Sequence, residues 1–256
     1  MQSRAQLIRD LILYHLPTSV HSQSTMLGAF AAKSSQVDYG ERKTISELFL
    51  NYQSSSVINY YVQGIFFHRI LNHILRQPNL HDIFCFRHAI IDLINSLRRP
   101  LPAEDDSVSL VLYRGQKMTI FELEKMKNNE RQIFSAAPFL STTMDHRIAQ
   151  IFMGDGSDDD PCVVSVIFKI YLDTGQPMRP YARVNNSAEE EVLLSPGTKF
   201  ILMSCRKLHN KGQLWLFELK AITEKQQEQV VLNYGETFLL LSEGSAWPTS
   251  VVIVHI

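Results

Sequence analysis

Three consecutive glutamates, Glu189 to Glu191, stand directly before the apolar run Val192–Leu194. Acidic residues are depleted in β-strands and adjacent like charges repel each other, so carboxylates in this place need a reason. If the strand includes them, side chains alternate, and Glu189 and Glu191 share one face about 7 Å apart while Glu190 points the other way. Two carboxylates then face one site. The alternative is a solvated strand entry, since charge runs usually face water.

Two earlier segments offer complementary chemistry. Tyr113-Arg114-Gly115 closes the predicted strand 107–113. The planar guanidinium of Arg114 could hold a phosphate, and Gly115 lets the backbone approach a ligand closely. In Phe139–Thr143, Ser141 and Thr143 share one strand face, and their hydroxyls could orient a carboxylate or bind a ribose. Taken singly, Arg114 also fits a surface ion pair, and the Ser/Thr run of the second segment also fits an ordinary edge strand.

In this order and at these separations, the three segments resemble the R-S-E signature of arginine-specific mono-ADP-ribosyltransferases, a family of bacterial toxins and animal ecto-enzymes. The resemblance extends over about residues 45–222. Thr143 stands where the family's Ser-Thr-Ser ends in serine, and it keeps the hydroxyl. The signal peptide and paired cysteines of the animal enzymes are absent, and residues 155–160 form an acidic insertion near the loop on the nicotinamide side.

The resemblance implies transfer of ADP-ribose from NAD, used as a substrate without a metal, to an exposed arginine of a protein. Glu191 would stabilise the oxocarbenium-like ribose and Glu189 would hold the incoming guanidinium. Arg114 would bind the NAD phosphates, Gly115 would offer its backbone to the nicotinamide amide, and Ser141 would fix Glu191 and the ribose. An NAD glycohydrolase and a non-catalytic NAD-binding or interaction module remain alternatives.

The rest of the sequence is divided by its hydrophobic periodicity. Residues 1–43 lack a sustained period and indicate a loosely packed leader or linker, whereas residues 44–100 carry two helical stripes. Strand-like patterns follow over 101–222, and the role of residues 223–256 is open. The fold class is therefore α+β, and the resemblance implies a helical N-terminal lobe packed on a core of two mainly antiparallel β-sheets.

Local patterns predict the elements around the three segments. They predict a helix over 119–127 with a Thr cap and a helix over 145–152 whose apolar side carries Ile148, Ile151 and Phe152. Strands are expected over 163–172 and 214–219. The turn Pro196-Gly197 predicts that Val192–Leu194 pairs with residues 198–203 in a buried hairpin.

Composition excludes several classes of function. The chain of 256 residues has a formal net charge of −1, which gives no electrostatic footprint for nucleic acid or an anionic membrane. Cys85, Cys162 and Cys205 show no zinc-type spacing and are expected to be buried thiols. The histidines of residues 68–88 are expected to pack in the lobe or face water rather than bind metal. Without a convincing signal peptide or membrane span, we expect a cytoplasmic protein of unknown oligomeric state.

Overall fold

The computed structural model describes residues 10–34, 43, 47, 50–63, 65–77, 79–98, 109–127, 133–154, 160–176, 178–184, 190–208, 213–223, 225–226 and 252–254. The chain forms two compact units, Gln2–Pro100 and Leu101–Ile256, which we call the helical unit and the sheet unit. Each is described by itself.

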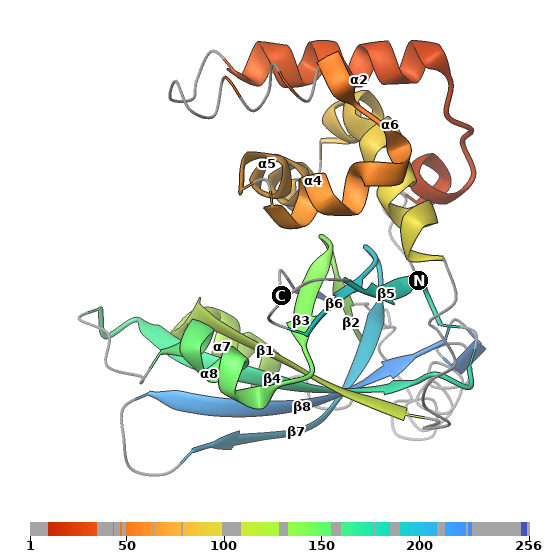
Figure 1. Cartoon of the computed structure of the whole chain (residues 1–256). Helices are drawn as coiled ribbons and strands as arrows, with labels where there is room; N and C mark the ends of the chain where they lie inside the picture. Colours follow the sequence, from red (N-terminus) through yellow and green to blue (C-terminus); the bar gives the residue numbers. More distant parts are fainter. Residues whose placement is uncertain are drawn as a thin grey trace, which may run out of the picture. The chain divides into compact units, whose positions relative to one another are not determined.

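The helical unit contains α2 (Val20–Ser34), the short 3₁₀ helix η1 (Ser54–Ser56), α4 (Val57–Gln63), α5 (Ile65–Arg76) and α6 (Leu80–Leu97), all shown in Figure 1. Helix α6 is capped by Asn79, whose side chain accepts hydrogen bonds from the backbone N–H groups of His81 and Asp82. Most of α6 is buried, as expected for the central helix of a bundle.

Helix α2 corrects the prediction of a loosely packed leader over residues 1–43. Its Met26 and Phe30 are fully buried, and the ring of Phe30 lies 4.8 Å from that of Phe86 in α6 and 5.2 Å from that of Phe67 in α5. Helix α2 is rich in polar residues and contributes only a few apolar side chains to the core. Its hydrophobic periodicity in the sequence is therefore weak, which explains why the helix was not predicted.

The sheet unit is built on strands that alternate with only two helices along the described part of the chain. The strands are β1 (Ser109–Thr119), β2 (Ile133–Ala136), β3 (Leu140–Thr143), β4 (Val163–Asp173), β5 (Tyr181–Arg183), β6 (Glu191–Leu194), β7 (Lys199–Lys207), β8 (Leu214–Ile222) and β9 (Val252–Val254). They form one sheet in the order β5-β6-β3-β1-β4-β8-β7-β2-β9. Neighbours are antiparallel except β4 with β8 and β2 with β9.

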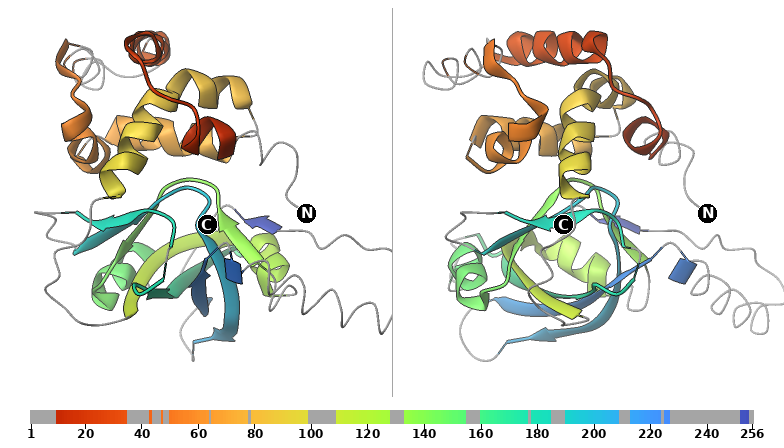
Figure 2. Two further views of the ribbon diagram at one scale, coloured as in Figure 1. Left: turned by 90° about the vertical axis from the view of Figure 1, so that its right-hand side faces the viewer. Right: turned by 45° about the vertical axis from the view of Figure 1, so that its right-hand side comes forward.

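This arrangement confirms the predicted α+β class with mainly antiparallel pairing. Hydrogen bonds join the strands into one continuous sheet of nine strands, however, instead of the two separate sheets that we expected. Figure 2 shows that the sheet is strongly curved. The curvature lets distant strands share one core, in which Phe168 of β4, Phe217 of β8 and Phe200 of β7 are completely buried together with Val192 of β6.

Two strand predictions are wrong in ways that affect the site. Strands β6 and β7 are not paired as a hairpin, because β6 lies between β5 and β3 while β7 lies between β8 and β2. The turn itself forms, with Gly197 at a φ of 78°. Strand β1 does not end at Arg114, since it pairs with β4 from Ser109 to Thr119. Pairing with β4 keeps the polar second half of β1 in the extended conformation.

The helices of the sheet unit are α7 (Ile120–Lys127) and α8 (His146–Met153). In α7 the predicted Thr cap is a capping box. The Thr119 hydroxyl accepts from the Glu122 N–H at 3.2 Å, and Glu122 accepts from the Thr119 N–H at 2.8 Å. Helix α7 adds Leu123 and Met126 to the core, whereas α8 packs on the other face of β1.

The buried face of α8 differs from the predicted one. Ala149 and Met153 are buried, while Ile151 and Phe152 are 78% and 58% exposed. The reason is Gly115 in β1, because a Cβ at this position would overlap the backbone carbonyl oxygen of Ala149 in α8. The helix backbone occupies the space that a side chain would need, so the face that carries Ala149 turns to the sheet.

Other expectations concern the ends of the chain and the cysteines. Strand β9 extends the sheet at β2, whereas most of residues 223–256, whose role the sequence leaves open, lie outside the described residues. The three cysteines are free thiols, but the prediction that they are buried is wrong, because Cys162 is exposed and Cys85 and Cys205 are half-buried. No helix within the described ranges has the length and hydrophobicity needed to cross a membrane.

Gly115→Ala should reduce the free energy of unfolding by about 1–3 kcal/mol, because the new methyl group forces α8 away from β1. Urea unfolding followed by circular dichroism measures this change. Gly28→Ala in α2 is the control. No atom lies within 4 Å of a Cβ at Gly28, so alanine should stabilise that helix by roughly 0.5–1 kcal/mol. Equal stability of Gly115→Ala and the wild type would contradict the close approach.

Candidate active site

Ser141 connects the three segments that the sequence analysis singled out. Its hydroxyl donates a hydrogen bond of 2.6 Å to Oε1 of Glu191, fifty positions along the chain. Its backbone carbonyl accepts a hydrogen bond of 2.9 Å from Nη1 of Arg114. The structure thus brings Arg114, Ser141 and Glu191 into one continuous chain of hydrogen bonds. Strand order explains this, since β3 lies between β1 and β6.

Glu191 is the first residue of β6 and pairs with Thr143 of β3. Only 8% of it is exposed. Ser141 lies diagonally across the ladder from Glu191 on the same face, which is the spacing that lets a short hydroxyl reach a longer carboxylate. A buried carboxylate requires hydrogen-bond donors, and the Ser141 hydroxyl supplies one.

Of the three glutamates expected to alternate along a strand, the structure describes Glu190 and Glu191. Glu190 has a φ of 46°, in the left-handed region, and the strand begins only after it. The backbone therefore turns at Glu190, which takes no part in strand β6. Glu189 itself lies outside the described residues.

Arg114 is held at two of its nitrogens. Besides the Nη1 contact with Ser141, Nε donates to the side-chain oxygen of Gln116 at 3.0 Å. Arg114 and Gln116 are two residues apart in β1, so their side chains leave the same face of the sheet. The sequence analysis did not single out Gln116. The signal that could have found it is an amide acceptor two positions from a key arginine in a strand.

Gly115 and Thr143 have structural roles in this arrangement. The missing side chain of Gly115 makes room for α8, as described above. Thr143 is buried, and its hydroxyl accepts a hydrogen bond of 3.0 Å from the backbone N–H of Asp145, the residue that caps α8. The strand end that carries Ser141 is thereby linked to the start of the helix.

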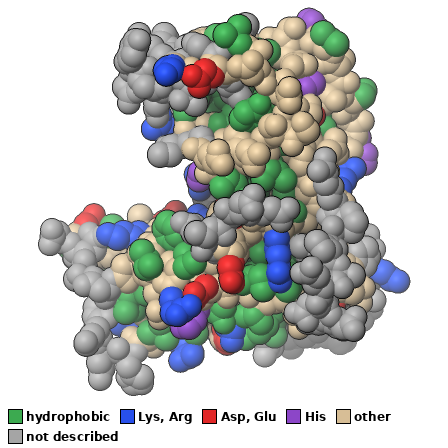
Figure 3. All heavy atoms as spheres, viewed as in Figure 1, with side chains coloured by type: hydrophobic (Ala, Val, Ile, Leu, Met, Phe, Trp, Pro, Cys, Tyr) green, Lys and Arg blue, Asp and Glu red, His purple; other side chains and the backbone are tan. Residues whose placement is uncertain are grey.

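Charged side chains gather at the start of α8, as Figure 3 shows for this region of the sheet unit. Asp145 accepts hydrogen bonds from the Arg147 side chain, the shortest of 2.7 Å, and these bonds hold the pKa of Asp145 at about 2. The acidic insertion that follows α8 lies mainly outside the described residues, which include only Asp160 of it.

Comparison with known proteins supplies a match at the level of structure. No protein-family model matches the sequence, and no curated protein matches it. Crystal structures of the Vis toxin, an ADP-ribosyltransferase from Vibrio splendidus, are similar to the chain with a TM-score of 0.51 at 15% identity. This similarity covers 84% of the chain and 92% of the toxin. The complex of Vis with agmatine gives a TM-score of 0.50, also at 15% identity, over 84% and 91% of the two chains.

A further similarity, with a TM-score of 0.47, is to the ADP-ribosyltransferase HopU1 of Pseudomonas syringae pv. tomato. Identity is 16%, and 81% of this chain and 99% of the other are covered. The similarity to Vis shows that the chain has the fold of an ADP-ribosyltransferase, as the resemblance of the three segments implied.

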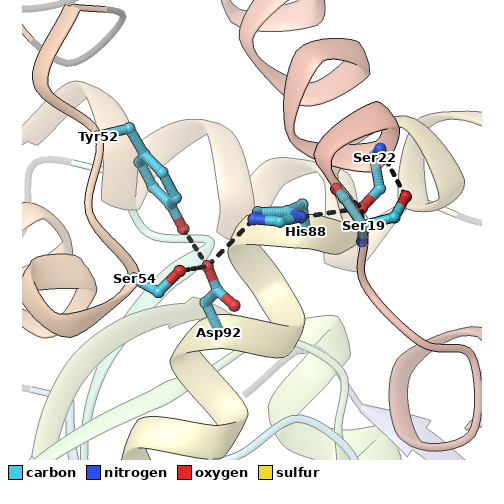
Figure 4. Close-up of polar contacts among 6 residues, drawn as sticks. All are labelled: Ser19, Ser22, Tyr52, Ser54, His88 and Asp92. Carbon is cyan, nitrogen blue, oxygen red and sulfur yellow. Dashed lines mark hydrogen bonds and ion pairs between the residues drawn. The ribbon is translucent and has the colours of Figure 1, made fainter.

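The helical unit holds a second polar cluster, drawn in Figure 4. His88 and Asp92 of α6 lie one turn apart, with His88 Nε2 3.4 Å from Asp92 Oδ2. The other ring nitrogen of His88 lies 2.9 Å from the Ser22 hydroxyl in α2. Asp92 Oδ2 also accepts hydrogen bonds of 2.8 Å from Tyr52 and 2.6 Å from Ser54.

The order serine, histidine, aspartate in this cluster is that of a hydrolase triad, but its burial excludes the role. Ser22 has no exposed surface, so its hydroxyl cannot reach a substrate. The hydroxyl is also 2.8 Å from the Ser19 carbonyl oxygen, to which it can donate. Within the described ranges, no group of three metal-binding side chains occurs either. The cluster therefore joins α2 and the segment of Tyr52 to α6.

The cluster should make the helical unit sensitive to acid. Burial lowers the pKa of His88 despite the opposing effect of Asp92, and the nearby Arg87 lowers it further. Unfolded histidine binds a proton at about pH 6.5, above the folded pKa, so the free energy of unfolding should fall as the pH drops below 6.5. Urea titrations at pH 7.5 and 5.5 measure the difference.

His88→Gln removes the titrating ring and is the control for this effect. It should show a smaller loss of stability between the two pH values than the wild type, whatever its stability at pH 7.5. An identical loss in the wild type and the variant would show that another group is responsible.

Proposed function

We propose that the protein transfers ADP-ribose from NAD to an arginine side chain of a protein acceptor and releases nicotinamide. The observation that carries this proposal is the hydrogen-bonded chain Arg114–Ser141–Glu191 within an ADP-ribosyltransferase fold. It combines a cation suited to phosphates, a hydroxyl and a buried carboxylate in the order of the family's signature.

Glu191 is assigned to the ribose. The bond between the ribose C1′ and the nicotinamide nitrogen breaks, and nicotinamide leaves with the bonding electrons, so positive charge develops on the ribose. A carboxylate close to that charge stabilises the transition state, most effectively where water is excluded. Only 8% of Glu191 is exposed, and its carboxylate is held by the Ser141 hydroxyl. Both observations support this role.

Arg114 is assigned to the NAD phosphates. Its guanidinium matches phosphate oxygens in shape and charge, and its Nη1 contact places it beside the strand that carries Ser141. Ser141 in turn holds Glu191 and the ribose. Gly115 remains assigned to the nicotinamide amide through its backbone, in addition to its contact with α8.

Arginine is the proposed acceptor because Glu189 stands two positions before Glu191, as the resemblance requires. Attack by a guanidinium nitrogen on C1′ forms the new bond and releases one proton, which the Glu189 carboxylate would accept. The structural similarity to Vis, which has been crystallised with the guanidino compound agmatine, supports the test of that small acceptor here.

Glu191→Gln should reduce both ADP-ribose transfer to agmatine and NAD cleavage at least a hundredfold, since loss of one such electrostatic contact costs about 2.7–4 kcal/mol. Mass spectrometry of nicotinamide and the agmatine adduct measures both. Glu190→Gln is the matched control, because it removes the neighbouring charge and leaves the Ser141 contact intact. Transfer at the wild-type rate by Glu191→Gln would refute the assignment.

Glu189→Gln should abolish transfer to agmatine while some NAD cleavage remains, because water can still take the ribose when the guanidinium is no longer held. The same assay separates the two products. Normal transfer by this variant would exclude the assigned role of Glu189. Nicotinamide release without adduct by the wild type would instead identify an NAD glycohydrolase.

A further inference from the structure

We propose that Gln116 is a positioning residue, which holds the guanidinium of Arg114 in the orientation that binds the phosphates of NAD. This inference rests on the proposed function and adds to it a residue outside the three signature segments. The contact that carries it is the hydrogen bond of 3.0 Å from Arg114 Nε to the Gln116 side-chain oxygen.

Two acceptors fix the arginine from different nitrogens. Gln116 takes Nε and the Ser141 carbonyl takes Nη1, at 3.0 Å and 2.9 Å. A guanidinium is planar, so it cannot turn without breaking one of these contacts. The orientation of the plane is therefore set before any ligand binds.

The surrounding backbone makes Gln116 a firm support. Gln116 pairs with Val166 and Arg114 with Phe168 in the ladder between β1 and β4, where both partner side chains are completely buried. Arg114 and Gln116 are themselves only half-buried. A long arginine side chain loses rotamer freedom when it is ordered, and a neighbour that has already ordered it reduces this cost for the ligand.

The side-chain amide of Gln116 is uncharged, which suits a site that binds phosphates. A carboxylate at this place would hold Nε more strongly, but it would neutralise the positive charge that attracts a phosphate. The neutral oxygen of glutamine orients the guanidinium and leaves its charge intact. Gln116 therefore differs from Glu191, whose negative charge is required in the reaction.

The test compares Gln116→Leu with the wild type by calorimetry with NAD and by kinetics with NAD and agmatine. Loss of the acceptor should weaken NAD binding and raise KM about tenfold, which corresponds to about 1.4 kcal/mol, because the ligand must then order the Arg114 side chain itself. The kcat should change less than about twofold, since phosphates are bound alike before and during the reaction. Lys117→Gln, at an exposed neighbouring position, is the control.

Coupling to Arg114 is tested by a double-mutant cycle with Arg114→Met, which has no donor for Gln116. Gln116→Leu should have no further effect on the Kd for NAD or on kcat/KM in the Arg114→Met background. An equal loss in both backgrounds would overturn the inference, as would unchanged NAD binding by Gln116→Leu or a fall in kcat alone.

The same measurements separate this inference from the proposed function. If the wild type binds NAD without forming products, the transferase proposal fails, and the Kd values of the four proteins still decide the role of Gln116. If the wild type does not bind NAD, both proposals are wrong.

Discussion

The site depends on one constraint, the need of a buried carboxylate for a hydrogen-bond donor. Glu191 is almost entirely removed from water at the start of β6, and the Ser141 hydroxyl donates a hydrogen bond of 2.6 Å to it. The strand that supplies this hydroxyl also supplies the carbonyl that receives Arg114. With β3 between β1 and β6, one residue of the middle strand can contact both neighbours. The strand order thus determines that an anionic and a cationic group, far apart in the sequence, share a single support.

Strand β1, the neighbour of β3 that carries Arg114, is constrained on both faces. On one face of β1, Leu112 and Met118 enter the common core, and Arg114 and Gln116 occupy the positions between them. On the other face, Gly115 admits the backbone of α8. A side chain at Gly115 would displace α8, and Asp145, the residue that caps α8, donates a hydrogen bond to Thr143 at the end of β3. Packing around Gly115 is therefore connected to the strand that carries Ser141, through the α8 backbone and the Thr143 hydroxyl rather than through the reacting groups.

The helical unit also surrounds a buried carboxylate with hydrogen-bond donors, but there the carboxylate does not belong to a catalytic site. Asp92 is buried and accepts from Tyr52 and Ser54, with His88 beside it, so its charge is compensated by several neighbours. Tyr52 and Ser54 come from one segment and His88 from α6 itself, while Ser22 of α2 contacts His88. The cluster specifies how α2 and the Tyr52 segment dock on α6, and the burial of Ser22 separates it from any substrate. Residue types alone do not distinguish such a cluster from a catalytic one, whereas exposure does.

The sequence by itself determined features that depend on neighbouring residues. The alternation over 163–172 predicted β4, the Thr119 cap predicted the start of α7, and the order of three short segments implied the fold that the similarity to Vis shows. Only the tertiary structure decided which strands pair and which helix face is buried. Residues 192–194 pair with β3 and β5 instead of residues 198–203, Ile151 and Phe152 face outward, and Gln116 contacts Arg114. The strand pairing and the buried helix face depend on residues that lie far along the chain, and the contact of Gln116 depends on how far β1 extends. A local sequence pattern sets the hydrophobic period of a helix or strand, but it does not determine which element packs beside it.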